Sequence, residues 1–137
     1  DGSLFAISEG SKSTDGAIAW VSDRQGWSVM TYASTQGFRA SGAATIPDGN
    51  ILVLERRYTL RDGVAIRIMQ IDPRTIKPGA HLMPKLLAEF RHPLNVENFE
   101  GIEARRDERG KILIYIVSDN NFNPMQRNFL MMFELIK

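Results

Sequence analysis

Short apolar runs separated by tight-turn sequences are the main pattern of this chain. Several runs are rich in β-branched and aromatic residues, and the segment 65–71 (AIRIMQI) alternates apolar and polar positions with a period of two, as strands do. The turn sequences TDG, PDG, RDG and ERG lie between runs and pass easily through positive φ. The apolar runs cover residues 3–8, 17–22, 27–33, 50–55, 64–71, 86–90, 111–118 and 128–136. The pattern predicts an all-β chain built from antiparallel hairpins.

One segment is ambiguous. Residues 77–90 (KPGAHLMPKLLAEF) could carry a helical turn, which Pro78 and Pro84 would keep short.

A weak internal repeat suggests how the strands are organised. The segments 46–56 (IPDGNILVLER) and 107–119 (DERGKILIYIVSD) both read as a glycine turn, an apolar strand and a charged residue, and 14–23 (TDGAIAWVSD) resembles them. Repeats of this kind are typical of β-propeller blades, which take roughly 40 to 50 residues each, so 137 residues would supply about three four-stranded blades. A closed propeller needs roughly four to eight blades. We therefore expect either further chain or a second copy of this one to complete the ring; a free-standing β-sandwich is the alternative.

Composition narrows the functional classes. The net charge is +1, from 17 Lys and Arg against 16 Asp and Glu, which argues against bulk attraction to nucleic acid or an acidic membrane. No run of about 18 apolar residues is present to span a bilayer. Cysteine is absent, which removes disulfides, thiolate catalysis and zinc–thiolate sites, but fits either redox compartment. The opening DGSLFAISEG reads as turn and strand, as expected of a trimmed fragment and not of a signal peptide.

Four carboxylates are candidates for a common site. Glu55 and Asp119 are expected at the ends of apolar strands, Glu9 in a similar position, and Glu100 at the start of another strand. If these are inner strands of neighbouring blades, the carboxylates line one mouth of a central channel, and converging oxygen ligands suit calcium or magnesium. The alternative is that they pair with nearby arginines: Arg39, Arg56, Arg57 and Arg127.

The polar loop 118–127 (SDNNFNPMQR) separates two strongly apolar runs. Its asparagines suit Asx-turns, Phe122 is expected as a buried anchor, and Asp119 and Arg127 are placed to pair across the neck of the loop. Either the loop satisfies itself, or it places Asp119 and Asn120 at the channel mouth with Arg127 as a fork for phosphate or carboxylate.

Other chemistry-bearing residues give weaker signals. Because neighbours in a strand point to opposite faces, only one residue of the doublet Arg56–Arg57 is expected to face a site. His81 and His92 are expected to be loop residues, since no metal-binding spacing joins them. Trp20 and Trp27 are expected to pack on each other or on a neighbouring blade. The sequence contains no G-x-S-x-G elbow, P-loop or dinucleotide fingerprint.

Three motifs carry a family resemblance. The segments 46–58 (IPDGNILVLERRY), 98–104 (NFEGIEA) and 118–135 (SDNNFNPMQRNFLMMFEL) resemble the bacterial phytase-like family, also described as the esterase-like activity of phytase. The resemblance runs from about Gly37 to the C-terminus, with a fainter match over 4–10 (LFAISEG). It implies a β-propeller fold, with residues 1–137 as the C-terminal part of the domain, calcium as the cofactor, and a periplasmic or extracellular location.

The resemblance also implies a function. A metal-assisted phosphate-ester hydrolase would use Glu9, Glu55, Glu100 and Asp119 as cation ligands, with Asn120, Arg127 and Arg56 holding a phosphorylated small molecule. The alternative is a non-catalytic propeller module that binds a ligand or a protein. A third reading is an inactive fragment with open edges that forms homo-oligomers.

Overall fold

The computed structural model describes residues 2–10, 16–94 and 96–136. These residues form strands and one short 3-10 helix, η1 (Pro73–Thr75), with no α-helix among them. None of the described residues belongs to a helix that could cross a bilayer. The strands are β1 (Phe5–Ile7), β2 (Ala17–Asp23), β3 (Gly26–Tyr32), β4 (Arg39–Thr45), β5 (Ile51–Thr59), β6 (Gly63–Ile71), β7 (His81–Leu82), β8 (Lys85–Arg91), β9 (Phe99–Arg106), β10 (Ile112–Ser118) and β11 (Leu130–Leu135). The all-β prediction is confirmed.

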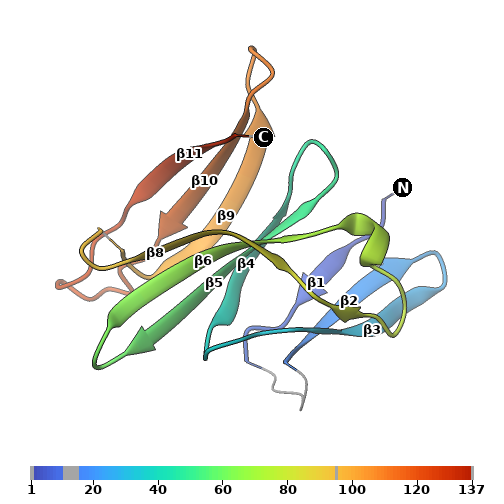
Figure 1. Cartoon of the computed structure of the whole chain (residues 1–137), viewed down its shortest axis with the longest axis horizontal. Helices are drawn as coiled ribbons and strands as arrows, with labels where there is room; N and C mark the ends of the chain where they lie inside the picture. The colour runs from blue at the N-terminus through green and yellow to red at the C-terminus, as the bar shows by residue number, and fades with distance from the viewer. Residues whose placement is uncertain (1, 11–15, 95, 137) are drawn as a thin grey trace.

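The strands make three curled sheets that lie side by side (Figure 1). The N-terminal sheet has the order β1-β2-β3-β7, the middle sheet β4-β5-β6-β8, and the C-terminal sheet β11-β10-β9. All pairs are antiparallel except β3 with β7, which run parallel over two residues. A two-sheet sandwich, the alternative considered for this sequence, does not form.

The internal repeat has a structural counterpart. The repeated segments become β2, β5 and β10, and each is the second strand of its sheet. The turns before β5 and β10 are alike: the N–H of Gly49 donates to Ile46 O at 2.8 Å, and that of Gly110 to Asp107 O at 3.0 Å. Both glycines have positive φ, which a side chain would disfavour. Residues 14 and 15 of the third turn, TDG, lie outside the described residues.

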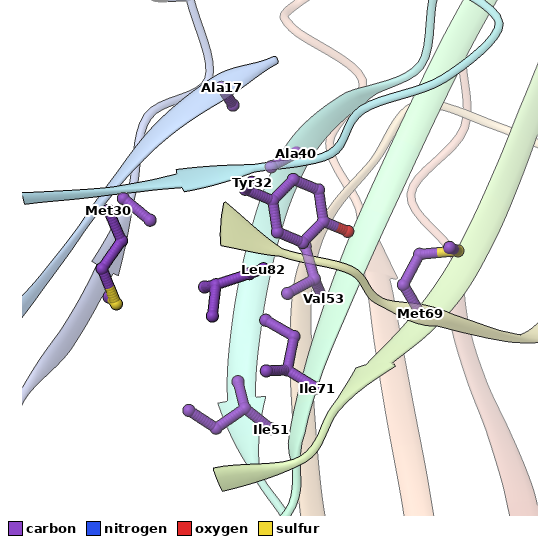
Figure 2. Close-up of a cluster of buried hydrophobic side chains, with 10 residues drawn as sticks. Ala17, Met30, Tyr32, Ala40, Ile51, Val53, Met69, Ile71 and Leu82 are labelled. Carbon is purple, nitrogen blue, oxygen red and sulfur yellow. The ribbon is translucent and has the colours of Figure 1, made fainter. Parts of the chain in front are cut away.

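Two apolar clusters join the sheets. Between the N-terminal and middle sheets, Tyr32 and Leu82 pack against Val53 and Ile71 (Figure 2). The cluster between the middle and C-terminal sheets contains Ile46, Leu52, Leu54, Ile66, Ile68, Phe99, Ala104, Ile112, Ile114 and Ile116. Strand β5 supplies alternate residues to the two clusters, as the period-two geometry of a strand requires. The direction of a side chain on β5 therefore decides which neighbouring sheet it meets.

Three local features differ from the expectations based on the sequence. The segment 77–90 forms β7 and β8 and no helical turn. Glu55 does not end its strand, because pairing with β6 carries β5 on to Thr59. Strand β4 was not anticipated, because apart from Arg39 its sequence RASGAAT has only small side chains and no large apolar residue. Small residues are needed there: a Cβ added at Gly42 would lie 3.1 Å from the carbonyl oxygen of Glu100 on β9.

Candidate functional site

Three polar side chains, those of Glu9, Asn98 and Glu100, meet at Arg56, and we call these four residues the Arg56 cluster. Arg56 Nη2 lies 2.8 Å from Glu9 Oε1 and 4.0 Å from Glu100 Oε1. Arg56 Nη1 donates to Asn98 Oδ1, and Asn98 Nδ2 donates to Glu100 Oε1 at 2.6 Å. The cluster brings together three of the seven residues predicted for the site.

The fold explains this convergence. Glu9 lies two residues after β1, Asn98 immediately precedes β9, and Glu100 is the second residue of β9. The first strands of the three sheets, β1, β4 and β9, are neighbours in space. Arg56 points to the same side of β5 as Leu52 and Leu54, toward the C-terminal sheet, and its long side chain also reaches Glu9.

A pocket of about 310 Å³ opens beside the Arg56 cluster. It is lined by Glu9, Gly37, Arg39, Arg56, Arg57, Tyr58, Val64 and Asn98. Both members of the Arg56–Arg57 doublet line it, although they leave β5 on opposite faces. The reason is side-chain length: Arg57 bends back to donate to Gln36 O at 3.1 Å and lies over the Phe38 ring.

Arg39 is the arginine of this pocket that has no carboxylate partner among the described residues. It faces Arg56 directly across the β4–β5 pair, and like charges in that position repel each other. Glu9 and Glu100 approach Arg56, and Asp62 lies 3.9 Å from Arg57. The exposed Arg39 side chain has no hydrogen bond or ion pair to any residue in the described ranges.

Glu55 belongs to a different environment. It is buried against the N-terminal sheet, where Tyr32 donates its hydroxyl proton to Glu55 Oε1 at 2.9 Å. Burial raises the pKa of the Glu55 carboxyl above its ordinary value, while the Tyr32 hydrogen bond and the charge of Arg67 oppose the rise. Burial also raises the pKa of Tyr32, and the negative charge of Glu55 adds to the effect. Glu55 is therefore separated from the Arg56 cluster by the middle sheet itself.

The side chains of Asp119 and of the polar loop accept hydrogen bonds from the backbone of the loop itself. Asp119 follows β10 as predicted, and its carboxylate accepts the N–H of Asn121 at 3.0 Å. Asn120 accepts the N–H of Phe122, and Asn128 accepts the N–H of Asn120. Among the described residues no ion pair joins Asp119 to Arg127, whose side chain is exposed. The loop is thus a series of Asx-turns, and only the Asp119 backbone N–H reaches the cluster, through Asn98 O at 3.2 Å.

Phe122 does not anchor this loop. It is fully exposed, at 100%, and adopts a positive φ of 57°. The prediction of a buried Phe122 is wrong because the asparagines, and not an apolar contact, fix the turn.

The carboxylates do not form a cation site by themselves. Within residues 2–10, 16–94 and 96–136 no three or more His, Asp and Glu side chains are grouped as a metal would need. Glu9 and Glu100 are held by an arginine, which occupies the place a cation would take. The described residues therefore do not fit calcium, and a calcium site would need ligands from elsewhere.

Asn98 is the cluster member that sequence reasoning did not assign. It is buried, and its amide joins Arg56 to Glu100. The signal was present in the N-x-E-G motif at 98–101, where the spacing i, i+2 sends both side chains to one face of a strand.

Comparison with known proteins identifies the family. A sequence model of the phytase-like family, described as the esterase-like activity of phytase, matches residues 1–122. The chain belongs to this family. The match begins well before Gly37, where the motif resemblance started, and ends inside the polar loop. No curated protein and no solved structure matches the chain.

Proposed function

We propose that the chain is part of a phytase-like β-propeller whose arginine-lined pocket binds a phosphate-bearing small molecule. In this proposal the three sheets are successive blades, and β1, β4 and β9 are their inner strands. The observation that carries the ligand class is the Arg39–Arg56 pair: two arginines side by side, one of them without a carboxylate, beside a pocket large enough for a phosphate group. Arginine forks suit phosphate oxygens in geometry and charge.

The side chains of the pocket support phosphate binding as the first candidate function. Arg39 would meet the anion directly, while Arg56 is held in place by Asn98 and Glu9 and so is preorganised. Asn120 and Arg127, also predicted to hold substrate, would contribute only by a movement of the polar loop.

Phosphate-ester hydrolysis is the second candidate, and family membership favours it. The Glu9 and Glu100 carboxylates lie beside the proposed phosphate position. Calcium would need ligands in addition to Glu9, Glu55, Glu100 and Asp119. Export to the periplasm or the cell exterior is part of the same family-based proposal.

Titration with inorganic phosphate and with a phosphomonoester, followed by calorimetry, tests the binding proposal. Arg39→Ala should weaken binding by about tenfold or more, because a hydrogen bond to a charged group is worth about 1.5–3 kcal/mol. Arg109→Ala, which removes an exposed arginine from the turn before β10, is the matched control and should leave the affinity unchanged. Equal affinities of wild type and Arg39→Ala would remove this pocket as the site.

Calcium separates the two candidate functions. A ligand at a hundredfold over its dissociation constant stabilises the folded state by about 2.7 kcal/mol. A rise in Tm with calcium, together with release of phosphate from the monoester, supports hydrolysis. Phosphate binding without either effect supports the non-catalytic module.

A further inference from the structure

The pocket beside the Arg56 cluster has an apolar side that phosphate binding alone does not use. Tyr58 and Val64 form this side, and they lie opposite each other in the β5–β6 pair. Val64 is half-buried, because it also packs against the apolar cluster between the middle and C-terminal sheets. The Tyr58 side chain is 68% exposed, so its ring is accessible to a ligand in the pocket.

Strand pairing in the middle sheet sets the separation between this ring and the arginines. Arg56 and Tyr58 are two residues apart in β5, so their side chains leave the same face of the strand about 6.5 Å apart. The pairing of β5 with β6 extends to Thr59 and Gly63, which holds the backbone of Tyr58 in the sheet. Arg39 lies opposite Arg56 on β4. A phosphate group held by the two arginines would therefore lie one short substituent away from the Tyr58 ring.

The pocket also has room for more than a phosphate group. Its volume of about 310 Å³ lies at the lower end of the range for small-molecule sites, roughly 300–1,000 Å³. Such sites combine apolar and aromatic walls with a few polar groups that fix the orientation of the ligand. Here the arginines would fix the phosphate, which leaves the Tyr58 and Val64 side of the pocket to contact the rest of the ligand.

We infer that the pocket selects aryl phosphates, with the phosphate on Arg39 and Arg56 and the aromatic ring packed on Tyr58. In an aryl phosphate a single ester oxygen joins the phosphorus to the ring, which matches the short step from the arginines to Tyr58. Two aromatic rings attract each other in offset-stacked or edge-to-face arrangements, beyond the burial of their apolar surface. The inference rests on the phosphate binding proposed above, and it adds the chemical class of the group that the phosphate carries.

Calorimetry with phenyl phosphate and methyl phosphate tests the inference at about pH 8, where both esters are dianions because their second pKa is near 6. The wild-type chain should bind phenyl phosphate about fivefold more tightly, the lower end of what stacking on an aromatic side chain contributes. Tyr58→Ala should weaken phenyl phosphate binding about fivefold and bring the two affinities together. Tyr58→Phe should keep the preference, because stacking requires the ring and not the hydroxyl. Equal affinities of the wild type for the two esters, or a preference that survives in Tyr58→Ala, would overturn the inference.

Two further variants separate this inference from the binding proposal. Trp27→Ala removes an exposed aromatic ring from β3, outside the lining of the pocket, and should keep the preference for phenyl phosphate. Arg39→Ala should weaken the binding of both esters alike, because it removes a contact to the phosphate that they share. Methyl phosphate binding without a preference for phenyl phosphate would overturn this inference and leave the pocket proposal standing. If neither ester binds, both fail. Circular dichroism and Tm check that each variant is folded.

Discussion

Two neighbouring rows of cross-strand residues in the middle sheet differ in how their charges are paired. One row runs Ala40, Glu55, Arg67, Glu89, and the next runs Arg39, Arg56, Ile66, Phe90. The Glu55 row alternates charge signs, and Arg67 Nε donates to Glu89 Oε2 at 2.6 Å inside the protein. The Arg39 row sets two positive charges side by side at an open pocket. In the first row each charged residue has an oppositely charged neighbour, whereas in the second Arg39 lies opposite another arginine.

Arg67→Met should have the largest effect on stability. Arg67 is buried, pairs with Glu89 and stacks 3.8 Å from the centre of the Phe38 ring. Its loss leaves Glu55 without a cation and Glu89 with only the exposed Arg91 as partner, and breaking a buried pair in this way costs about 3–5 kcal/mol. Urea denaturation measures the change. Arg61→Met, at an exposed turn, is the control and should change the unfolding free energy by less than about 0.5 kcal/mol. Equal losses in the two variants would show that the charge pairing of the Glu55 row does not stabilise the fold.

Tyr32→Phe should have the next largest effect. It keeps the ring in the core but removes the hydroxyl that donates to buried Glu55. An unsatisfied buried acceptor costs about 1–3 kcal/mol. Thermal and urea unfolding measure the loss, with Tyr58→Phe on the exposed pocket rim as the control. A neutral result for Tyr32→Phe would mean that water replaces the hydroxyl.

Glu55→Gln should flatten the pH dependence of stability. The pKa of Glu55 is raised in the folded state, so the folded protein binds this proton more tightly than the unfolded chain does. The corresponding stability is fully present below the ordinary glutamate pKa and is lost as the pH rises through the raised folded value. Urea unfolding from acid to neutral pH should show this fall in wild type and a smaller one in Glu55→Gln. An unchanged profile would show that the carboxyl does not titrate in this range.

Glu9→Gln should have the smallest effect on stability. It should strengthen phosphate binding, whereas Arg39→Ala should weaken it. The Glu9–Arg56 pair is exposed, and such pairs contribute about 0–1 kcal/mol. Removing the carboxylate leaves the pocket more positive, so phosphate should bind up to about fivefold more tightly, equivalent to ~1 kcal/mol. Calorimetry with inorganic phosphate measures this, and weaker binding would indicate that Glu9 positions Arg56 and does not compete with the anion.

The strand predictions succeeded where local pattern carries the information. Alternation placed β6, and apolar runs next to glycine turns placed β5 and β10, because the period of a strand and the φ of its turn are local properties. Strand β4 was missed because its small residues are required by contact with β9, far along the chain. Phe122 was misplaced because an apolar residue in a loop was assumed to be buried.

The site was only partly readable from the sequence. Glu9, Arg56 and Glu100 were predicted to share a site and do meet. Glu55 was predicted to join them, but it directly precedes Arg56 in β5 and therefore points to the other face of the sheet. In a strand that single step reverses the face, and the sequence does not tell which sheet covers which face.

The sequence alone determined that the chain is all-β, where most strands and turns fall, and which family it resembles, since these depend on neighbouring residues. Only the tertiary structure decided that Glu9, Arg56, Asn98 and Glu100 share one cluster while Glu55 is buried behind the sheet. Their convergence depends on how three sheets pack, and packing is set by contacts between residues far apart in the chain.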